Sequence, residues 1–199
     1  MARADARILI LGSMPGQASL TAQQYYAHPR NQFWSIIARV CGIGLELPYG
    51  ERLERLQEWG VALWDVLASC ERRGSLDSAI EHRTAVANDL PAVLRRCQGI
   101  RRICCNGGTA YAALQRCLGP WLAAHTQPAA ATHSQDMEGM RGLEVLRLPS
   151  TSPANASWSP ARKFEAWRVA LTAAPDRPPA PAATPASKPA RPGAIPNPR

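Results

Sequence analysis

Short apolar runs alternate with amphipathic segments along this chain. Apolar runs of strand length occupy residues 8–11, 60–64, 100–105 and 144–148. Such runs are typical of strands buried in a parallel sheet, and segments with helical periodicity or helix-start signals separate them. This order predicts an α/β protein, a three-layer α/β/α sandwich with a central four-stranded parallel sheet.

Capping residues, prolines in first turns and glycines mark the ends of the predicted helices. These signals place helices at residues 33–41, 52–58, 88–97, 107–118 and from 159 onward. Asn31 can cap the first of these helices. Gly119 and Pro120 should end the fourth, because proline removes a helical hydrogen bond and clashes with the preceding turn.

The composition changes near residue 175. Residues 175–199 hold nine of the 18 prolines, six alanines and no aromatic residue. Such a segment buries too little apolar surface to offset its ordering entropy. We therefore expect one domain over residues 1–174, followed by a disordered, basic, Pro/Ala-rich tail over residues 175–199.

The formal net charge of +8 favours polyanionic partners such as nucleic acid, although charge alone is weak evidence. The six cysteines form no CxxC pair, which argues for reduced thiols rather than disulfides or a zinc site. No apolar run is long enough for a secretory signal or a membrane span. We therefore expect a cytoplasmic protein with no membrane contact.

Aromatic and polar residues crowd into residues 25–34, whose sequence is Tyr-Tyr-Ala-His-Pro-Arg-Asn-Gln-Phe-Trp. This mixture is too polar for a core strand and too aromatic for an ordinary loop. Two other distinctive segments follow predicted strands, Gly-Ser-Met-Pro-Gly at 12–16 and Pro-Ser-Thr-Ser-Pro-Ala-Asn-Ala at 149–156. Since functional groups gather at the carboxyl ends of parallel strands, we expect these segments to lie together.

In this order, the three segments resemble the motifs of the uracil-DNA glycosylase superfamily, and most closely its hypoxanthine-DNA glycosylase branch. The resemblance covers approximately residues 8–171. It implies a monofunctional DNA glycosylase in base excision repair, which removes hypoxanthine from deoxyinosine by water attack on a flipped nucleotide. It implies DNA as the partner, no metal ion or other cofactor, and a monomeric enzyme.

The resemblance also assigns roles to residues. It implies that Asn31 and Ser13 are catalytic: the Asn31 carboxamide orients the water, while the neutral Ser13 hydroxyl cannot serve as a carboxylate base. Tyr26 would present its ring to the extruded base. The predicted base-binding residues are Gly12, Met14, Pro15, Tyr26 and Asn106, the last of which lies at the end of the third predicted strand. The predicted DNA-binding residues are His28, Ser150, Thr151, Ser152 and Pro153.

Several of these residues also have a purely structural interpretation. Asn31 could merely cap its helix, and His28 could hold its loop through hydrogen bonds. For Asp65, at the end of the second strand, an ion pair with Arg72 is the favoured role. Lys163 is the only lysine before the tail, and we expect it to be solvated or to contact phosphate, which argues against a Schiff-base mechanism.

Other functions fit the same residues. One alternative is a DNA glycosylase that excises uracil or a mismatched pyrimidine, which is the same class of enzyme with a different target base. A non-catalytic protein that binds DNA lesions would keep base flipping without the chemistry. A hydrolase of free nucleosides is a third alternative, against which the basic charge and the 149–156 segment argue mildly.

Overall fold

The computed structural model describes residues 1–126 and 142–173, so the predicted tail over residues 175–199 lies outside the described residues. The central sheet has four strands in the order β2-β1-β5-β6, and all neighbouring pairs are parallel. These strands are β1 (Ile8–Gly12), β2 (Val61–Asp65), β5 (Arg102–Asn106) and β6 (Glu144–Leu148). The predicted four-stranded parallel sheet is confirmed.

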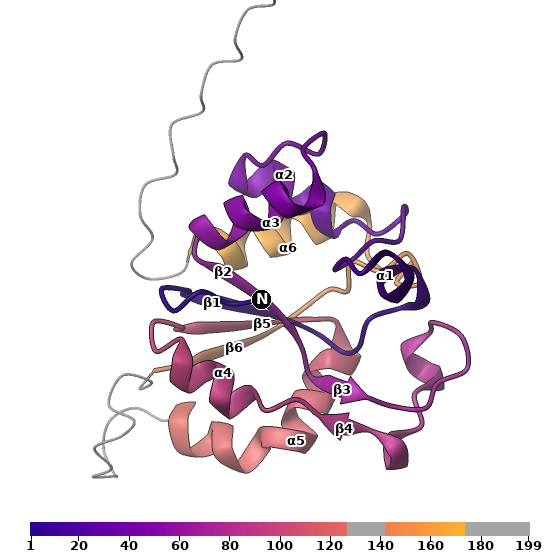
Figure 1. The fold of residues 1–199 in the computed structure, drawn as a ribbon, viewed down its shortest axis with the longest axis vertical. Helices are drawn as coiled ribbons and strands as arrows, with labels where there is room; N and C mark the ends of the chain where they lie inside the picture. The colour runs from indigo at the N-terminus through magenta and orange to yellow at the C-terminus, as the bar shows by residue number, and fades with distance from the viewer. Residues whose placement is uncertain (127–141, 174–199) are drawn as a thin grey trace, which may run out of the picture.

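Helices cover both faces of this sheet, as Figure 1 shows. One face carries α2 (Phe33–Cys41), α3 (Tyr49–Glu58) and α6 (Pro160–Thr172), while the other carries α4 (Leu90–Arg96) and α5 (Gly108–Thr126). The three-layer arrangement predicted from the sequence is therefore present. Asp89 and Ser159 cap α4 and α6 as expected, each accepting a hydrogen bond from a backbone N–H in the first turn.

The hydrophobic core has two parts, one on each face of the sheet. Leu9 and Leu11 pack with α4 and α5, whereas Ile8 and Ile10 pack with Phe33 and the helices of the opposite face. Successive side chains of a strand point to opposite faces, so β1 contributes to both parts. This double burial explains why the run is continuously apolar.

Helix α5 differs from its prediction, because it continues through Pro120 to Thr126 instead of ending at Gly119. Leu122, which follows the proline, is only 3% exposed and packs into the core. We attribute the continuation to this tertiary contact, which offsets the hydrogen bond that Pro120 cannot donate.

Short elements that the sequence did not predict surround one edge of the sheet. They are α1 (Gln17–Ala22), the antiparallel pair β3 (Leu67–Ser69) and β4 (Val86–Ala87), and the 3-10 turns η1 (Asp77–Ala79) and η2 (His82–Thr84). Gly12 lies in register with Asp65, and Asn106 with Leu148, so the four main strands end together. The loops that leave these strands therefore gather at a single edge.

Candidate active site

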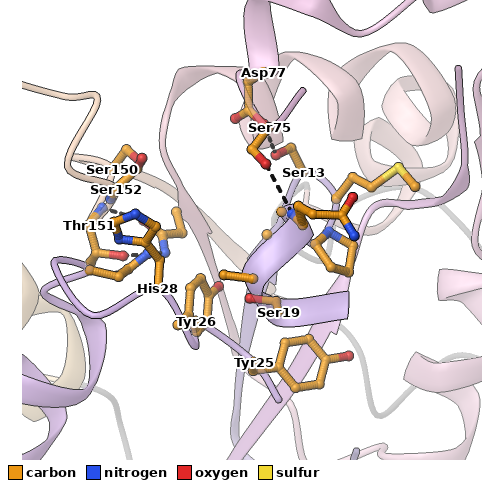
Figure 2. Close-up of a pocket in the computed structure, with 18 of the residues that line it drawn as sticks. Ser13, Ser19, Tyr25, Tyr26, His28, Ser75, Asp77, Ser150, Thr151 and Ser152 are labelled. Atoms are coloured by element: carbon orange, nitrogen blue, oxygen red, sulfur yellow. Dashed lines mark hydrogen bonds between the residues drawn. The ribbon is translucent and has the colours of Figure 1, made fainter. Parts of the chain in front are cut away.

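A cavity of about 890 Å³ opens at the carboxyl ends of the strands. It is lined by every residue for which a role in catalysis, base binding or DNA binding was predicted: Gly12, Ser13, Met14, Pro15, Tyr26, His28, Asn31, Asn106, Ser150, Thr151, Ser152 and Pro153. Figure 2 shows Ser13, Tyr26, His28 and the 150–152 loop around it. The three segments thus form one site, while the role of each residue stays a prediction.

The loop after β1 is held by the segment that contains η1. The Ser13 hydroxyl donates a hydrogen bond to Asp77 Oδ1 at 2.8 Å, and Arg72 Nη2 donates to the Pro15 carbonyl at 2.5 Å. Arg72 Nη1 also lies 3.9 Å from Asp77 Oδ1. The ion pair expected between Arg72 and Asp65 is therefore wrong, because Arg72 pairs with Asp77.

Asp65 lies in the wall of the cavity at the end of β2, and it is only 8% exposed. Its carboxyl group crosses over Gly12, where the methyl group of an alanine would come within 2.3 Å of Asp65 Oδ1. Glycine at position 12 therefore makes room for this carboxyl. Burial raises the pKa of Asp65 to about 7, and the nearby negative charge of Asp77 adds to the effect.

Tyr26 presents an aromatic ring inside the cavity from an uncommon backbone conformation. Its φ is +57°, in the left-handed region that non-glycine residues seldom occupy and that is frequent at functional sites. One face of its ring stacks on Phe33, with centroids 4.0 Å apart and planes tilted by 26°. Ser19 Oγ accepts a hydrogen bond from the N–H of Ala27 and so fixes the segment to α1.

Asn31 lines the cavity at the start of α2. Its Oδ1 accepts a hydrogen bond from the backbone N–H of Phe33, the first residue of α2, at 3.0 Å. The N-cap position itself is Gln32, so Asn31 holds the start of the helix from one residue before the predicted cap. Within the described residues, its Nδ2 group makes no hydrogen bond. The backbone N–H of Gln32 donates to the Thr151 carbonyl at 3.0 Å, which joins this segment to the loop after β6.

Asn106 fastens the loop after β6 to the end of β5. Its Oδ1 accepts from the backbone N–H of Thr151 at 2.8 Å, and its Nδ2 donates to Thr151 Oγ1 at 2.9 Å, both in a buried setting. The carboxamide is therefore largely committed to the protein. Only its remaining N–H and lone pair are left for the predicted contact with a base.

Helix α6 holds the same loop from the other side. Lys163 Nζ donates to the Asn155 carbonyl at 2.7 Å, and Trp167 Nε1 donates to the Pro149 carbonyl at 2.9 Å. Lys163 is only 3% exposed, and burial lowers its pKa. The expectation of a solvated or phosphate-contacting lysine is therefore wrong. Lys163 is not among the residues that line the cavity.

His28 and the neighbouring Arg30 lie on the wall of the cavity. The His28 Nδ1 accepts a hydrogen bond from the backbone N–H of Arg30 at 3.2 Å, in agreement with a loop-holding role. Sequence reasoning did not place Arg30, Ser75 or Asp77 at the site. Arg30 lies inside the aromatic segment and could have been noticed there, whereas the other two reach the cavity only through tertiary folding.

Residues 1–126 and 142–173 contain no group of three or more His, Cys, Asp or Glu side chains that could hold a metal ion. The cysteines of these residues are free, and four of them, Cys41, Cys97, Cys104 and Cys105, are buried. In the same ranges, no helix has the length and apolar character needed to cross a membrane.

Comparisons with known proteins point to one family. The family model described as the uracil DNA glycosylase superfamily matches residues 1–172. A hypoxanthine DNA glycosylase of Methanosarcina acetivorans is 32% identical over 162 residues, which cover 81% of this chain and 88% of that protein. A hypoxanthine DNA glycosylase of Methanosarcina barkeri is 41% identical over 78 residues, covering 39% of this chain and 49% of that protein.

A solved structure has the same fold. It is a solution NMR structure from Methanosarcina acetivorans, provisionally described as a uracil DNA glycosylase. It superimposes with a TM-score of 0.65 and 31% sequence identity, and covers 85% of this chain and 91% of that chain.

Proposed function

Because this chain belongs to the uracil DNA glycosylase superfamily and is a DNA glycosylase, we propose that the base it removes is hypoxanthine in deoxyinosine. Two relatives that are 32% and 41% identical to this chain are named hypoxanthine DNA glycosylases. The proposed reaction is the hydrolysis of the N-glycosidic bond of a nucleotide swung out of the DNA helix.

The observation that carries this proposal is the presence of Asn31 and Tyr26 in one cavity with both glycosylase loops. The Tyr26 ring, supported by Phe33 on one face, would stack on the extruded base, a contact worth roughly 1–3 kcal/mol. The Asn31 carboxamide would hold a water molecule for attack on C1′. Its contact with Phe33 favours this role, because it fixes the carboxamide while Oδ1 keeps a second lone pair.

The proposed product is an abasic site in an intact strand. Cleavage of the strand through a Schiff base would require an amine at the reacting sugar. Lys163 is buried, donates to the Asn155 carbonyl and does not line the cavity. These features support water rather than Lys163 as the nucleophile.

A panel of duplex and single-stranded oligonucleotides, each with a single inosine, uracil or mismatched thymine, tests the proposal. Uracil belongs in the panel because the solved neighbour is described as a uracil DNA glycosylase. The inosine strand should become alkali-labile fastest and should stay intact before alkali treatment. Preferred cleavage at uracil would show that the excised base is a pyrimidine and not hypoxanthine. Tight binding without an alkali-labile product would indicate a lesion-binding protein.

A further inference from the structure

We propose that the Asp65 carboxyl group is the acid that protonates the departing purine of hypoxanthine, at N7, while the water held by Asn31 attacks the sugar. This inference rests on the proposed function, since a purine leaving group is the one that benefits from a proton on its imidazole ring. It gives Asp65 a catalytic role in place of the ion pair expected from the sequence.

The position of Asp65 is the first argument. Its carboxyl group is 8% exposed, lines the cavity and lies across the end of β1, above a glycine that leaves space for it. Within the described residues, no side chain donates a hydrogen bond to it or forms an ion pair with it. A carboxyl group that is buried without a partner and faces a ligand cavity is usually kept for the ligand.

The surroundings of Asp65 raise its pKa toward neutral pH. The titratable groups around it are Tyr25 and Tyr26, the Asp77 carboxylate and the Met1 ammonium group. Burial raises the pKa of Asp65 to about 7, the charge of Asp77 adds to this, and the ammonium group opposes it. A group with a pKa near the operating pH is well matched to general acid catalysis.

The two carboxyl groups of the site have different environments. Burial raises the pKa of Asp77 as well, but the hydrogen bond from Ser13 and the positive charge of Arg72 both act in the opposite direction. Asp77 therefore has a hydrogen bond and an ion pair that favour its ionised form, whereas for Asp65 the charge of the Met1 ammonium group alone acts in that direction among the described residues. Such a pair of carboxyl groups commonly divides into an acid and a charged neighbour.

Other donors in the cavity fit the role less well. Burial raises the pKa of Tyr25 and of Tyr26 far above the physiological range, so these phenols hold their protons too tightly. The Ser13 hydroxyl hydrogen already points at Asp77. Two alternatives remain among the described residues. His28 holds its own loop through Nδ1, and the Met1 ammonium group, whose pKa burial lowers to about 6, donates to the Leu63 carbonyl. The Asp65→Asn variant described below separates both from Asp65.

The proposed step moves one proton from Asp65 to the base and one from water to solvent. The Asp65 proton passes to N7 as the bond between N9 and C1′ breaks, and N9 keeps the electron pair, so hypoxanthine leaves as a neutral molecule. The water oxygen forms the new bond to C1′ and loses one proton. That proton returns through solvent to the Asp65 carboxylate, which restores the acid for the next turnover. General acid catalysis of this kind typically contributes about 10²–10⁴-fold in rate.

Asp65→Asn is the decisive variant, because an amide of the same shape still donates a hydrogen bond but cannot transfer a proton. Single-turnover release of hypoxanthine from an inosine duplex is measured between pH 5.5 and 9. The wild-type rate should be highest below the pKa of Asp65 and fall about tenfold per pH unit above it, since the protonated form is the active one. The variant should be at least about 10²-fold slower below pH 7 and should lack this decline.

Asp5→Asn serves as the matched control, since Asp5 is exposed, forms an ion pair with Arg3 and is not among the residues that line the cavity. It should leave the rate and the pH profile unchanged. A second arm uses wild-type protein with an oligonucleotide in which N7 of the inosine is replaced by C–H. This substrate removes the proton acceptor without altering the protein, so it gives a result even if Asp65→Asn does not fold.

The outcomes separate this inference from the proposed function. Failure of the wild-type protein to release hypoxanthine would refute the proposed function and this inference with it. The wild-type protein could release hypoxanthine while Asp65→Asn keeps the same rate or the same decline in rate at high pH. Either result would overturn only the role of Asp65. Undiminished cleavage of the N7-substituted inosine would overturn it as well.

Discussion

Replacing Asn31 by Ala removes two things at once, a hydrogen bond at the start of α2 and the proposed water-holding group. This hydrogen bond comes from the Phe33 N–H to Asn31 Oδ1 at 3.0 Å, and its loss should lower the free energy of unfolding by about 1 kcal/mol. The loss in catalysis should be larger. Misplacing an attacking group commonly costs about 10²-fold, which corresponds to about 2.7 kcal/mol in the activation free energy.

Three measurements separate the two effects. Single-turnover cleavage of an inosine duplex with enzyme in excess gives the rate of the chemical step, anisotropy gives the affinity for the same duplex, and urea unfolding gives the stability. Asp89→Ala is the matched control, because Asp89 Oδ1 accepts from the Ala92 N–H at 2.9 Å and caps α4 outside the cavity. It should lower stability similarly and leave the rate unchanged.

We predict that the Asn31→Ala protein still binds the duplex but is at least about 10²-fold slower in the bound complex. A rate within about twofold of wild type, with only the stability lowered to the same extent as in Asp89→Ala, would refute it. Asn31 would then only hold the start of α2.

Three further predictions concern the walls of the site. Lys163→Met removes the hydrogen bond to the Asn155 carbonyl and should weaken DNA binding by about three- to tenfold in an anisotropy titration, whereas unchanged affinity would show that this bond does not shape the loop. Asn106→Ala leaves the Thr151 N–H without its buried acceptor and should lower the free energy of unfolding by about 2–4 kcal/mol in urea, and a loss below about 0.5 kcal/mol would contradict this. Because the pKa of Asp65 is raised from 3.8 to about 7, wild-type stability should decline as pH rises through this window. The free energy of unfolding of Asp65→Asn should therefore gain about 2 kcal/mol relative to wild type between pH 5 and pH 8. The same difference in stability between variant and wild type at both pH values would argue against it.

The fold could be predicted because its main elements carry strong local signals. The strand of residues 8–12 is apolar throughout, as burial on both faces requires, and Asp89 and Ser159 cap their helices with their own side chains. Helix α1 and the β3–β4 pair are too short for a periodic pattern to reveal. The passage of α5 through Pro120 depends on the packing of Leu122, which no local signal shows.

The site could be predicted only in outline. Asn31 and Tyr26 stand in a segment whose composition is unusual, and the topology of the sheet brings it to the loops after β1 and β6. The sequence could not show that Asp65 is buried without a partner, since this depends on Gly12 in another strand. Nor could it show that Lys163 turns inward to the Asn155 carbonyl, since a lysine in the first turn of a helix is usually exposed.

Hydrolysis of the glycosidic bond of deoxyinosine in DNA is the reaction that we propose for this protein. Mass spectrometry of a reaction on a duplex with a single inosine tests it most directly, because it identifies both the freed base and the remaining strand. We expect free hypoxanthine and an uncut abasic strand in equal amounts, formed faster than uracil is released from the matched duplex. An unaltered inosine strand after prolonged incubation with an excess of folded protein would contradict this proposal.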